Sequence, residues 1–150
     1  MKIRLVTDTA ADLPREISEK YDIVIIPHII TIDDRNLKLG VDISIEELYN
    51  KMKTMDIIPR SSTPTPQDFL VVFQESFEKL GYDHIIYIAV AEKLTATLSV
   101  ARIAAKDFKD KITLFDTESA SGVQGLMLIA VLNMLEDNIP LEVIIKKLKE

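Results

Sequence analysis

The chain of 150 residues contains no cysteine and no tryptophan, and only four glycines. The lack of cysteine excludes disulfides, thiolate catalysis and cysteine-based metal sites. Nothing argues for an oxidising compartment, so a cytoplasmic location is the default expectation. The glycines, at positions 40, 81, 122 and 125, do not have the spacing of a GxGxxG or Walker loop. Nucleotide binding by a loop of known type is therefore excluded.

Positive charge and long apolar runs are also scarce. Lys and Arg number 18 against 24 Asp and Glu, a formal net charge of −6, and no basic cluster is interleaved with aromatic residues. No nucleic-acid partner is expected from this balance. The first apolar run meets Asp8 and Asp12 too soon for a signal peptide, and no run approaches the roughly 20 residues of a membrane span. We expect neither export nor membrane insertion.

Patterns typical of catalytic or metal sites are missing as well. His28 and His84 have no second histidine at metal-ligand spacing, which favours structural roles and predicts no metal site and no cofactor. No serine lies in a GxSxG context. Asp8 follows a β-rich run, where a carboxylate serves either as a helix N-cap or as an acid, base or ligand. An enzyme with Asp8 as base has the least support, because no nucleophile or metal-binding group accompanies it.

The composition, 47% apolar and 28% charged, is that of one soluble globular domain. Apolar β-branched runs alternate with helical segments that have their own start signals. This alternation predicts an α/β domain with a mostly parallel sheet of about four to five strands flanked by helices, and a turn at Asp33–Asn36 adds a small edge hairpin. The expected strands are 3–7, 23–26, 29–32, 85–89 and 112–115, and the expected helices are 12–20, 44–55, 66–81, 94–107, 126–135 and 140–150.

Four hydroxyl side chains lie in Arg60–Pro66, between two expected helices. Two prolines restrict this segment, which we expect to be a loop, and it leads into the helix that follows. Hydroxyls and the free N–H groups of that helix suit a carboxylate or phosphate oxygen, and a plain helix N-cap is the alternative.

Ligands of parallel sheets bind beyond the carboxyl ends of the strands, where Asp8 and Glu92 are expected. Ser121, ahead of an apolar helix, could bond a ligand or cap that helix.

Five collinear segments resemble the DegV family, bacterial proteins that bind one fatty acid and include the fatty-acid-binding subunit of fatty acid kinase. Thr7–Pro14 is similar to the family's TDSTADLP, Gly40–Ser44 to its DGxDIS turn and Arg60–Pro66 to its TSQPSP. Lys93–Thr97 is similar to its KLSGT segment, and Phe115–Gly122 to the segment from VDT to SxG. The likeness covers the whole chain.

The resemblance implies that a long-chain fatty acid lies with its acyl chain in an apolar tunnel and its carboxylate on hydroxyl groups, so that a partner fatty acid kinase can phosphorylate it. The binding protein itself supplies no chemistry. Residues 1–150 would form the amino-terminal α/β domain of a longer two-domain protein, with the second α/β domain absent. The site residues implied are Ser61, Ser62 and Thr63 as donors, Thr95 and Ser121 as secondary donors, and Asp8 as a shaping residue.

The chain departs from the family pattern where two serines precede KLSGT, because Ala91 and Glu92 stand there. Glu92 would place a carboxylate near the expected ligand carboxylate, and like charges repel. The alternative function is therefore a degenerate DegV-like domain that serves as an interaction or regulatory module without fatty acid. The face left by the missing domain, together with an apolar stripe on the last helix, predicts a homo-oligomer.

Overall fold

The computed structural model describes residues 1–55 and 58–149. Its main feature is a four-stranded sheet with the strand order β2-β1-β6-β7, in which all neighbouring strands run parallel. The strands are β1 (Ile3–Asp8), β2 (Val24–Ile26), β6 (His84–Ala89) and β7 (Ile112–Asp116). This sheet and its flanking helices confirm the predicted α/β fold.

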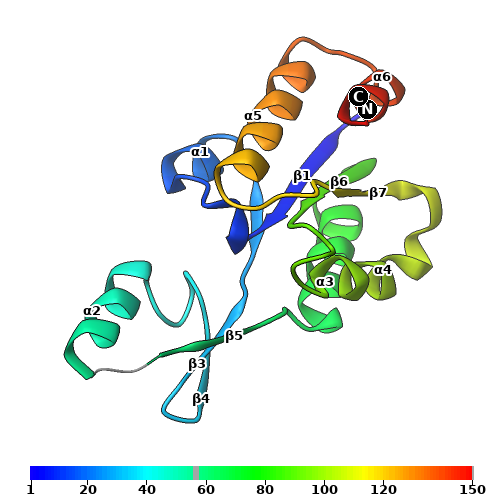
Figure 1. The fold of residues 1–150 in the computed structure, drawn as a ribbon. Helices are drawn as coiled ribbons and strands as arrows, with labels where there is room; N and C mark the ends of the chain where they lie inside the picture. Colours follow the sequence, from blue (N-terminus) through cyan, green and yellow to red (C-terminus); the bar gives the residue numbers. More distant parts are fainter. Residues whose placement is uncertain (56–57, 150) are drawn as a thin grey trace.

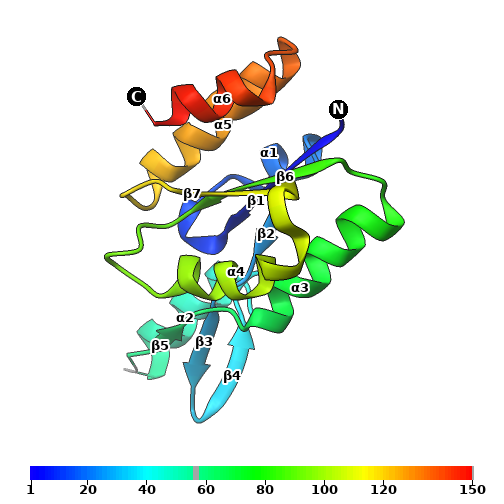
Figure 2. The ribbon, with the colours of Figure 1, turned by 90° about the vertical axis from the view of Figure 1, so that its right-hand side faces the viewer.

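Helices cover both faces of the parallel sheet (Figure 1, Figure 2). On one face lie α3 (Pro66–Gln74) and α4 (Thr97–Ala105), and on the other lie α1 (Arg15–Lys20), α5 (Gly122–Glu136) and α6 (Leu141–Leu148). Short turns of helix follow β1, α3 and α4, namely η1 (Thr9–Ala11), η2 (Glu75–Lys79) and η3 (Lys106–Lys111).

The central strand β6 shows why the sequence has continuous apolar runs. All six of its residues are buried. Ile85, Tyr87 and Ala89 belong to the core under α3 and α4, whereas Ile86 and Ile88 belong to the core under α5 and α6. Successive side chains of a strand point to opposite faces, so a strand covered on both sides needs apolar residues at every position.

A second, antiparallel sheet of three strands has the order β4-β3-β5 and lies beside α2 (Ile45–Met55), away from the main helical layers (Figure 1). The predicted hairpin is confirmed as β3 (Ile29–Ile32) with β4 (Arg35–Lys38). The hydroxyl segment, however, is not wholly a loop, because Arg60–Ser62 forms β5 and pairs with β3. The free edge of β3 offers backbone groups that need partners, and this segment supplies them.

Several helix boundaries also differ from the prediction. The helix expected from 94 begins at Thr97, and Leu94 lies before it with 69% of its surface exposed. The capping box that opens α2 is present, with the Ser44 and Glu47 backbone N–H groups each bonded to the other residue's side chain. The helix from Pro66 changes to π-helical geometry in η2 before it ends. The end expected at Glu150 falls outside the described residues.

The expectation that α6 has an unpartnered apolar stripe is wrong. Ile144 is fully buried, and Leu141 and Leu148 pack into the core between α5 and the sheet. The stripe packs inside the domain, in the same core cluster as Leu128, Val131 and Leu132 of α5. None of the described helices is long and apolar enough to cross a membrane.

Gly125 fixes the distance between α5 and η1, the turn that follows β1. A Cβ atom at this position would lie 3.0 Å from the carbonyl oxygen of Ala11, a backbone atom that cannot turn aside. We expect Gly125→Ala to lower the free energy of unfolding by about 1–3 kcal/mol, the usual cost of overpacking. Gly122→Ala is the matched control, since a Cβ there meets nothing within 4 Å. Urea unfolding of both variants is the measurement, and equal stability of the two would contradict this contact.

Candidate functional site

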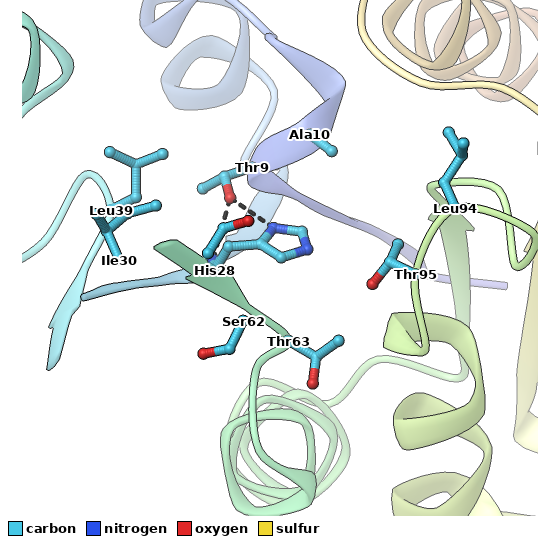
Figure 3. Close-up of a pocket in the computed structure, with 10 residues that line it drawn as sticks. Thr9, Ala10, His28, Ile30, Leu39, Ser62, Thr63, Leu94 and Thr95 are labelled. Atoms are coloured by element: carbon cyan, nitrogen blue, oxygen red, sulfur yellow. Dashed lines mark hydrogen bonds between the residues drawn. The ribbon is translucent and has the colours of Figure 1, made fainter. Parts of the chain in front are cut away.

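An open cavity of about 410 Å³ lies where the carboxyl end of β1 and the loop after β6 meet the small antiparallel sheet (Figure 3). Its lining combines hydroxyl groups, one imidazole and aliphatic side chains, which suits a ligand with a polar head and an apolar body. The lining residues are Thr9, Ala10, His28, Ile30, Leu39, Ser61, Ser62, Thr63, Leu94 and Thr95.

The structure therefore brings four of the predicted donors together: Ser61, Ser62, Thr63 and Thr95 all line this cavity. Strand pairing separates the two serines. Ser61 pairs with Ile30, which also lines the cavity, whereas Ser62 pairs with Ile29, which does not. Paired residues share a face of the sheet, so the Ser61 side chain lies on the Ile30 face and the Ser62 side chain on the Ile29 face, although both residues border the cavity. Figure 3 shows the Ser62 hydroxyl pointing away from His28.

The helix N-cap weighed as an alternative for the hydroxyl segment belongs to Thr65. Its side chain accepts from the Asp68 backbone N–H, and the Asp68 carboxylate accepts from the Thr65 backbone N–H at 2.8 Å. This capping box occupies the fourth hydroxyl of the segment. The three preceding hydroxyls are thereby left for another role.

Asp8 does not line the cavity, and its carboxylate is a buried acceptor within the protein. Its side chain is completely buried and accepts three hydrogen bonds, from the Tyr87 hydroxyl at 2.7 Å and from the backbone N–H groups of Ala10 and Val90. Burial, followed by the charge of Asp8, raises the pKa of Tyr87 well above its usual value, so this hydroxyl stays a donor. Asp8 caps η1 and so holds Thr9 and Ala10 at the cavity wall.

His28 is the site residue that sequence analysis missed. Its Nδ1 lies 2.8 Å from the Thr9 hydroxyl, and its Nε2 lies 3.1 Å from the Thr97 hydroxyl. The Thr97 hydroxyl in turn lies 2.8 Å from that of Thr95. One imidazole thus links the turn after β1 to the loop before α4. The signal in the sequence is the position of His28 directly after Pro27, where the chain leaves one sheet for the other.

Ser121 lies outside the cavity. Its hydroxyl donates to the Asp12 carboxylate at 2.6 Å, and it makes no side-chain cap to α5. Its backbone N–H donates to the carbonyl of Ala10, one of the lining residues. The structure therefore places Ser121 in contact with the cavity wall and not at the cavity surface.

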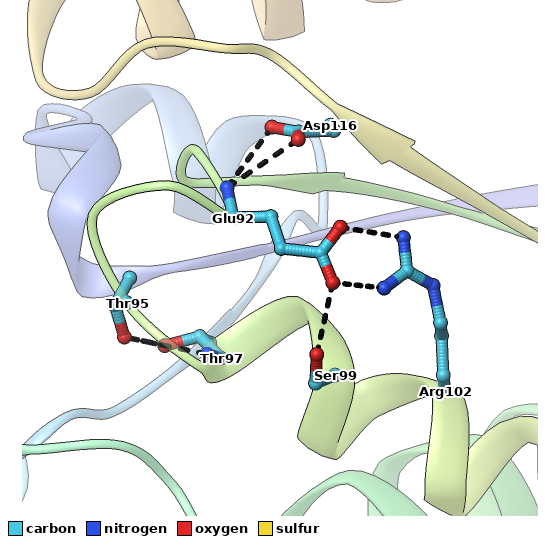
Figure 4. A network of polar contacts seen from close by, with 6 residues as sticks. All are labelled: Glu92, Thr95, Thr97, Ser99, Arg102 and Asp116. Carbon is cyan, nitrogen blue, oxygen red and sulfur yellow. Dashed lines mark hydrogen bonds and ion pairs between the residues drawn. The ribbon is translucent and has the colours of Figure 1, made fainter.

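Glu92 also lies outside the cavity lining. Its carboxylate forms a bidentate pair with the Arg102 guanidinium and accepts from the Ser99 hydroxyl at 2.9 Å (Figure 4). The hydrogen bonds from Arg102 and then Ser99 lower the pKa of the Glu92 carboxyl. This carboxylate is therefore ionised at neutral pH, with its countercharge on α4. Within residues 1–55 and 58–149, no group of three or more acidic or histidine side chains could hold a metal ion.

The structure is an α/β domain with an open, hydroxyl-lined cavity near the carboxyl ends of its parallel strands. A family model described as an uncharacterised protein of the DegV family matches residues 2–150, and the chain belongs to that family.

Among curated relatives, a DegV domain-containing protein of Listeria monocytogenes is 30% identical over 148 residues, which are 98% of this chain and 52% of the relative. The solved structure of a DegV family protein from Thermus thermophilus, described as binding fatty acid, has a TM-score of 0.89 at 29% identity. It matches 99% of this chain and 52% of its own. A stearic acid-binding protein from Eubacterium ventriosum has a TM-score of 0.88 at 27% identity, over 98% of this chain and 52% of its own. The chain spans about half the length of the relatives it matches.

Proposed function

We propose that this chain binds a long-chain fatty acid, with the carboxylate held by hydroxyl donors in the cavity beside the antiparallel sheet. The observation that carries the proposal is that Ser61, Thr63 and Thr95, from two distant segments, line one cavity with aliphatic neighbours. A carboxylate is an acceptor and needs donors, and hydroxyl groups supply them without a competing charge.

The apolar lining accounts for the other end of the ligand. Ile30, Leu39 and Leu94 line the cavity, and Leu94 is largely exposed. Burial of an acyl chain is worth about 0.8 kcal/mol per methylene group, so a few polar contacts suffice to orient the ligand. We propose that an apolar tunnel holds the rest of the acyl chain.

Membership of the DegV family supports a proposal for the biological setting. We propose that residues 1–150 form the amino-terminal domain of a longer protein, whose remainder closes the site. In this proposal the domain is non-catalytic and presents the fatty acid carboxylate to a partner kinase. Two proteins of solved structure, each matched by this chain over about half of its length, are described as fatty acid binding. This supports the proposed ligand class.

Native mass spectrometry tests this function. The chain is incubated with an equimolar mixture of saturated fatty acids of increasing length. The expected result is a one-to-one adduct that is more abundant for the longer acids, because each added methylene adds binding free energy. Absence of any adduct would contradict a defined fatty acid site. So would adducts that carry varying numbers of fatty acid molecules and are equally abundant for all chain lengths.

The Glu92→Ser variant discriminates the proposed function from the degenerate module. Because Arg102 neutralises the Glu92 carboxylate outside the cavity, we expect removal of this carboxylate to change fatty-acid affinity by no more than about fivefold, the scale of an exposed ion pair. Titration of a fluorescent fatty acid into both proteins is the measurement. A large gain in affinity would show that Glu92 does repel the ligand and would favour the degenerate interpretation.

A further inference from the structure

The His28 ring lies in the middle of a hydrogen-bonded chain whose two ends reach the cavity. The chain runs from Thr9 through His28 and Thr97 to Thr95, with successive distances of 2.8, 3.1 and 2.8 Å. Thr9, His28 and Thr95 line the cavity, whereas Thr97 is completely buried. Thr97 can therefore exchange hydrogen bonds only with its protein neighbours.

Two further contacts restrict the hydrogen atoms of the end hydroxyls. The Thr9 hydroxyl oxygen accepts from the His28 backbone N–H at 3.0 Å, and the Thr95 hydroxyl oxygen accepts from the Thr97 backbone N–H at 3.3 Å. Each end oxygen therefore has one remaining lone pair and one hydrogen to place.

With a neutral imidazole, the hydroxyl at one end of this hydrogen-bonded series must donate its hydrogen inward, to its neighbour in the series. If Nε2 carries the proton, it donates to Thr97, Thr97 donates to Thr95, and Thr95 can donate into the cavity. The Thr9 hydroxyl must then donate to Nδ1. The other tautomer reverses every bond, so that Thr9 faces the cavity as a donor and Thr95 does not.

With an imidazolium, both ring nitrogens are donors. Nδ1 donates to Thr9 and Nε2 donates to Thr97, which passes its own hydrogen to Thr95. The hydroxyl hydrogens of Thr9 and Thr95 are then both available to the cavity. Protonation of one ring thus changes the number of hydroxyl donors at these two ends from one to two.

We propose that His28 couples the binding of a carboxylate in this cavity to the uptake of one proton, because only the imidazolium makes both Thr9 and Thr95 donors to the ligand. This inference rests on the proposed function and adds a regulatory property to it. His28 is a positioning residue in this scheme, since it acts through the two threonines.

The charges around the ring set the direction of the effect. Burial lowers the pKa of His28 below its ordinary value of 6.5, and the charge of Asp8, at the end of β1, opposes that shift. The contacts from η1 and α4 are the uncharged Thr9 and Thr97. His28 is therefore neutral in the free protein at neutral pH, and a ligand carboxylate raises its pKa. Affinity rises as pH falls from above the pKa of the complex toward that of the free protein.

Calorimetric titration with decane-1-sulfonate, below its micelle concentration, tests the coupling, because a sulfonate keeps its charge throughout the range. We expect binding at least about fivefold tighter near pH 6 than near pH 8, with net proton uptake seen by comparing two buffers of different ionisation enthalpy.

The chain has only two histidines, which makes the controls simple. His84→Asn should keep the pH dependence, because the buried His84 bonds Thr113 outside the cavity. His28→Gln, which keeps an amide near Thr97, should lose it.

Proton NMR of the wild type gives a second measurement that does not depend on the variants folding. The His28 ring protons, assigned by comparison with His84→Asn, should report a pKa at least about one unit higher with the sulfonate bound. An unchanged His28 pKa, or binding without proton uptake, overturns this inference and leaves the proposed function standing. No binding of sulfonate or fatty acid at either pH overturns both.

Discussion

The Ser61→Ala variant is expected to bind a fluorescent long-chain fatty acid about 5- to 150-fold more weakly than the wild type, the equivalent of losing about 1–3 kcal/mol of hydrogen bonding to a charged group. Ser61 shares the cavity face of β5 with its partner Ile30. Removal of its hydroxyl takes away one donor without opening the core, because Ser61 is exposed. The affinity should therefore fall while the melting temperature changes little.

Ser62→Ala is the matched control for this prediction. It removes the same group from the adjacent residue of the same exposed strand, but from the face that pairs with Ile29. Ser62 borders the cavity, but its side chain lies on the other face of β5, so we expect Ser62→Ala to lose less affinity than Ser61→Ala. Equal losses in the two variants would contradict the assignment by strand pairing, and no loss in either would remove β5 from the site.

The Asp8→Ala variant is expected to lose about 3–5 kcal/mol of unfolding free energy, the largest stability effect that we predict for a single side chain here. The buried Tyr87 hydroxyl and the backbone N–H groups of Ala10 and Val90 would all lose their acceptor. Buried donors without acceptors retain their desolvation cost. Urea denaturation followed by circular dichroism measures the change.

Tyr87→Phe separates the parts of this network. It removes one of the three donors and leaves Asp8 bound by two backbone N–H groups, so we expect a smaller loss of about 1–2 kcal/mol. If Asp8→Ala were no more destabilising than Tyr87→Phe, Asp8 would not be the centre of the network, and its role in holding η1 would need another explanation.

Local patterns in the sequence predicted the parts of the fold that depend on neighbouring residues. The capping box at Ser44 and Glu47 and the hairpin turn at Asp33 and Asp34 are set by side chains within a few positions of one another. The buried strand at Ile85–Ala89 was visible because burial on both faces demands an unbroken apolar run.

Long-range pairing explains what the sequence could not supply. Nothing local shows that Arg60–Ser62 meets Ile29–Thr31, since polar serines have little strand propensity and the partner strand is distant in the chain. This pairing is nevertheless what turns Ser61 toward the cavity. The segment as a site could be predicted, whereas the orientation of its side chains could not.

Glu92 and His28 illustrate two kinds of missed information. Glu92 was predicted beside the ligand from its place after a strand, but Arg102 and Ser99 lie on one face of α4, three positions apart, and both bind it. That spacing was readable in the sequence. His28 has isoleucines after it, and its polar partners Thr9 and Thr97 lie far away in the chain, so only the folded structure shows its role.

The most direct test of a carboxylate site is the difference in affinity between a long-chain fatty acid and the fatty alcohol of the same length, measured by calorimetry on the chain of residues 1–150. The two ligands have the same acyl burial and differ only in the head group. If hydroxyl donors hold the carboxylate, the acid should bind at least about tenfold more tightly, as expected for charge-assisted hydrogen bonds, and Ser61→Ala should reduce that ratio. Equal affinities for the acid and the alcohol, or a ratio unaffected by Ser61→Ala, would contradict the account.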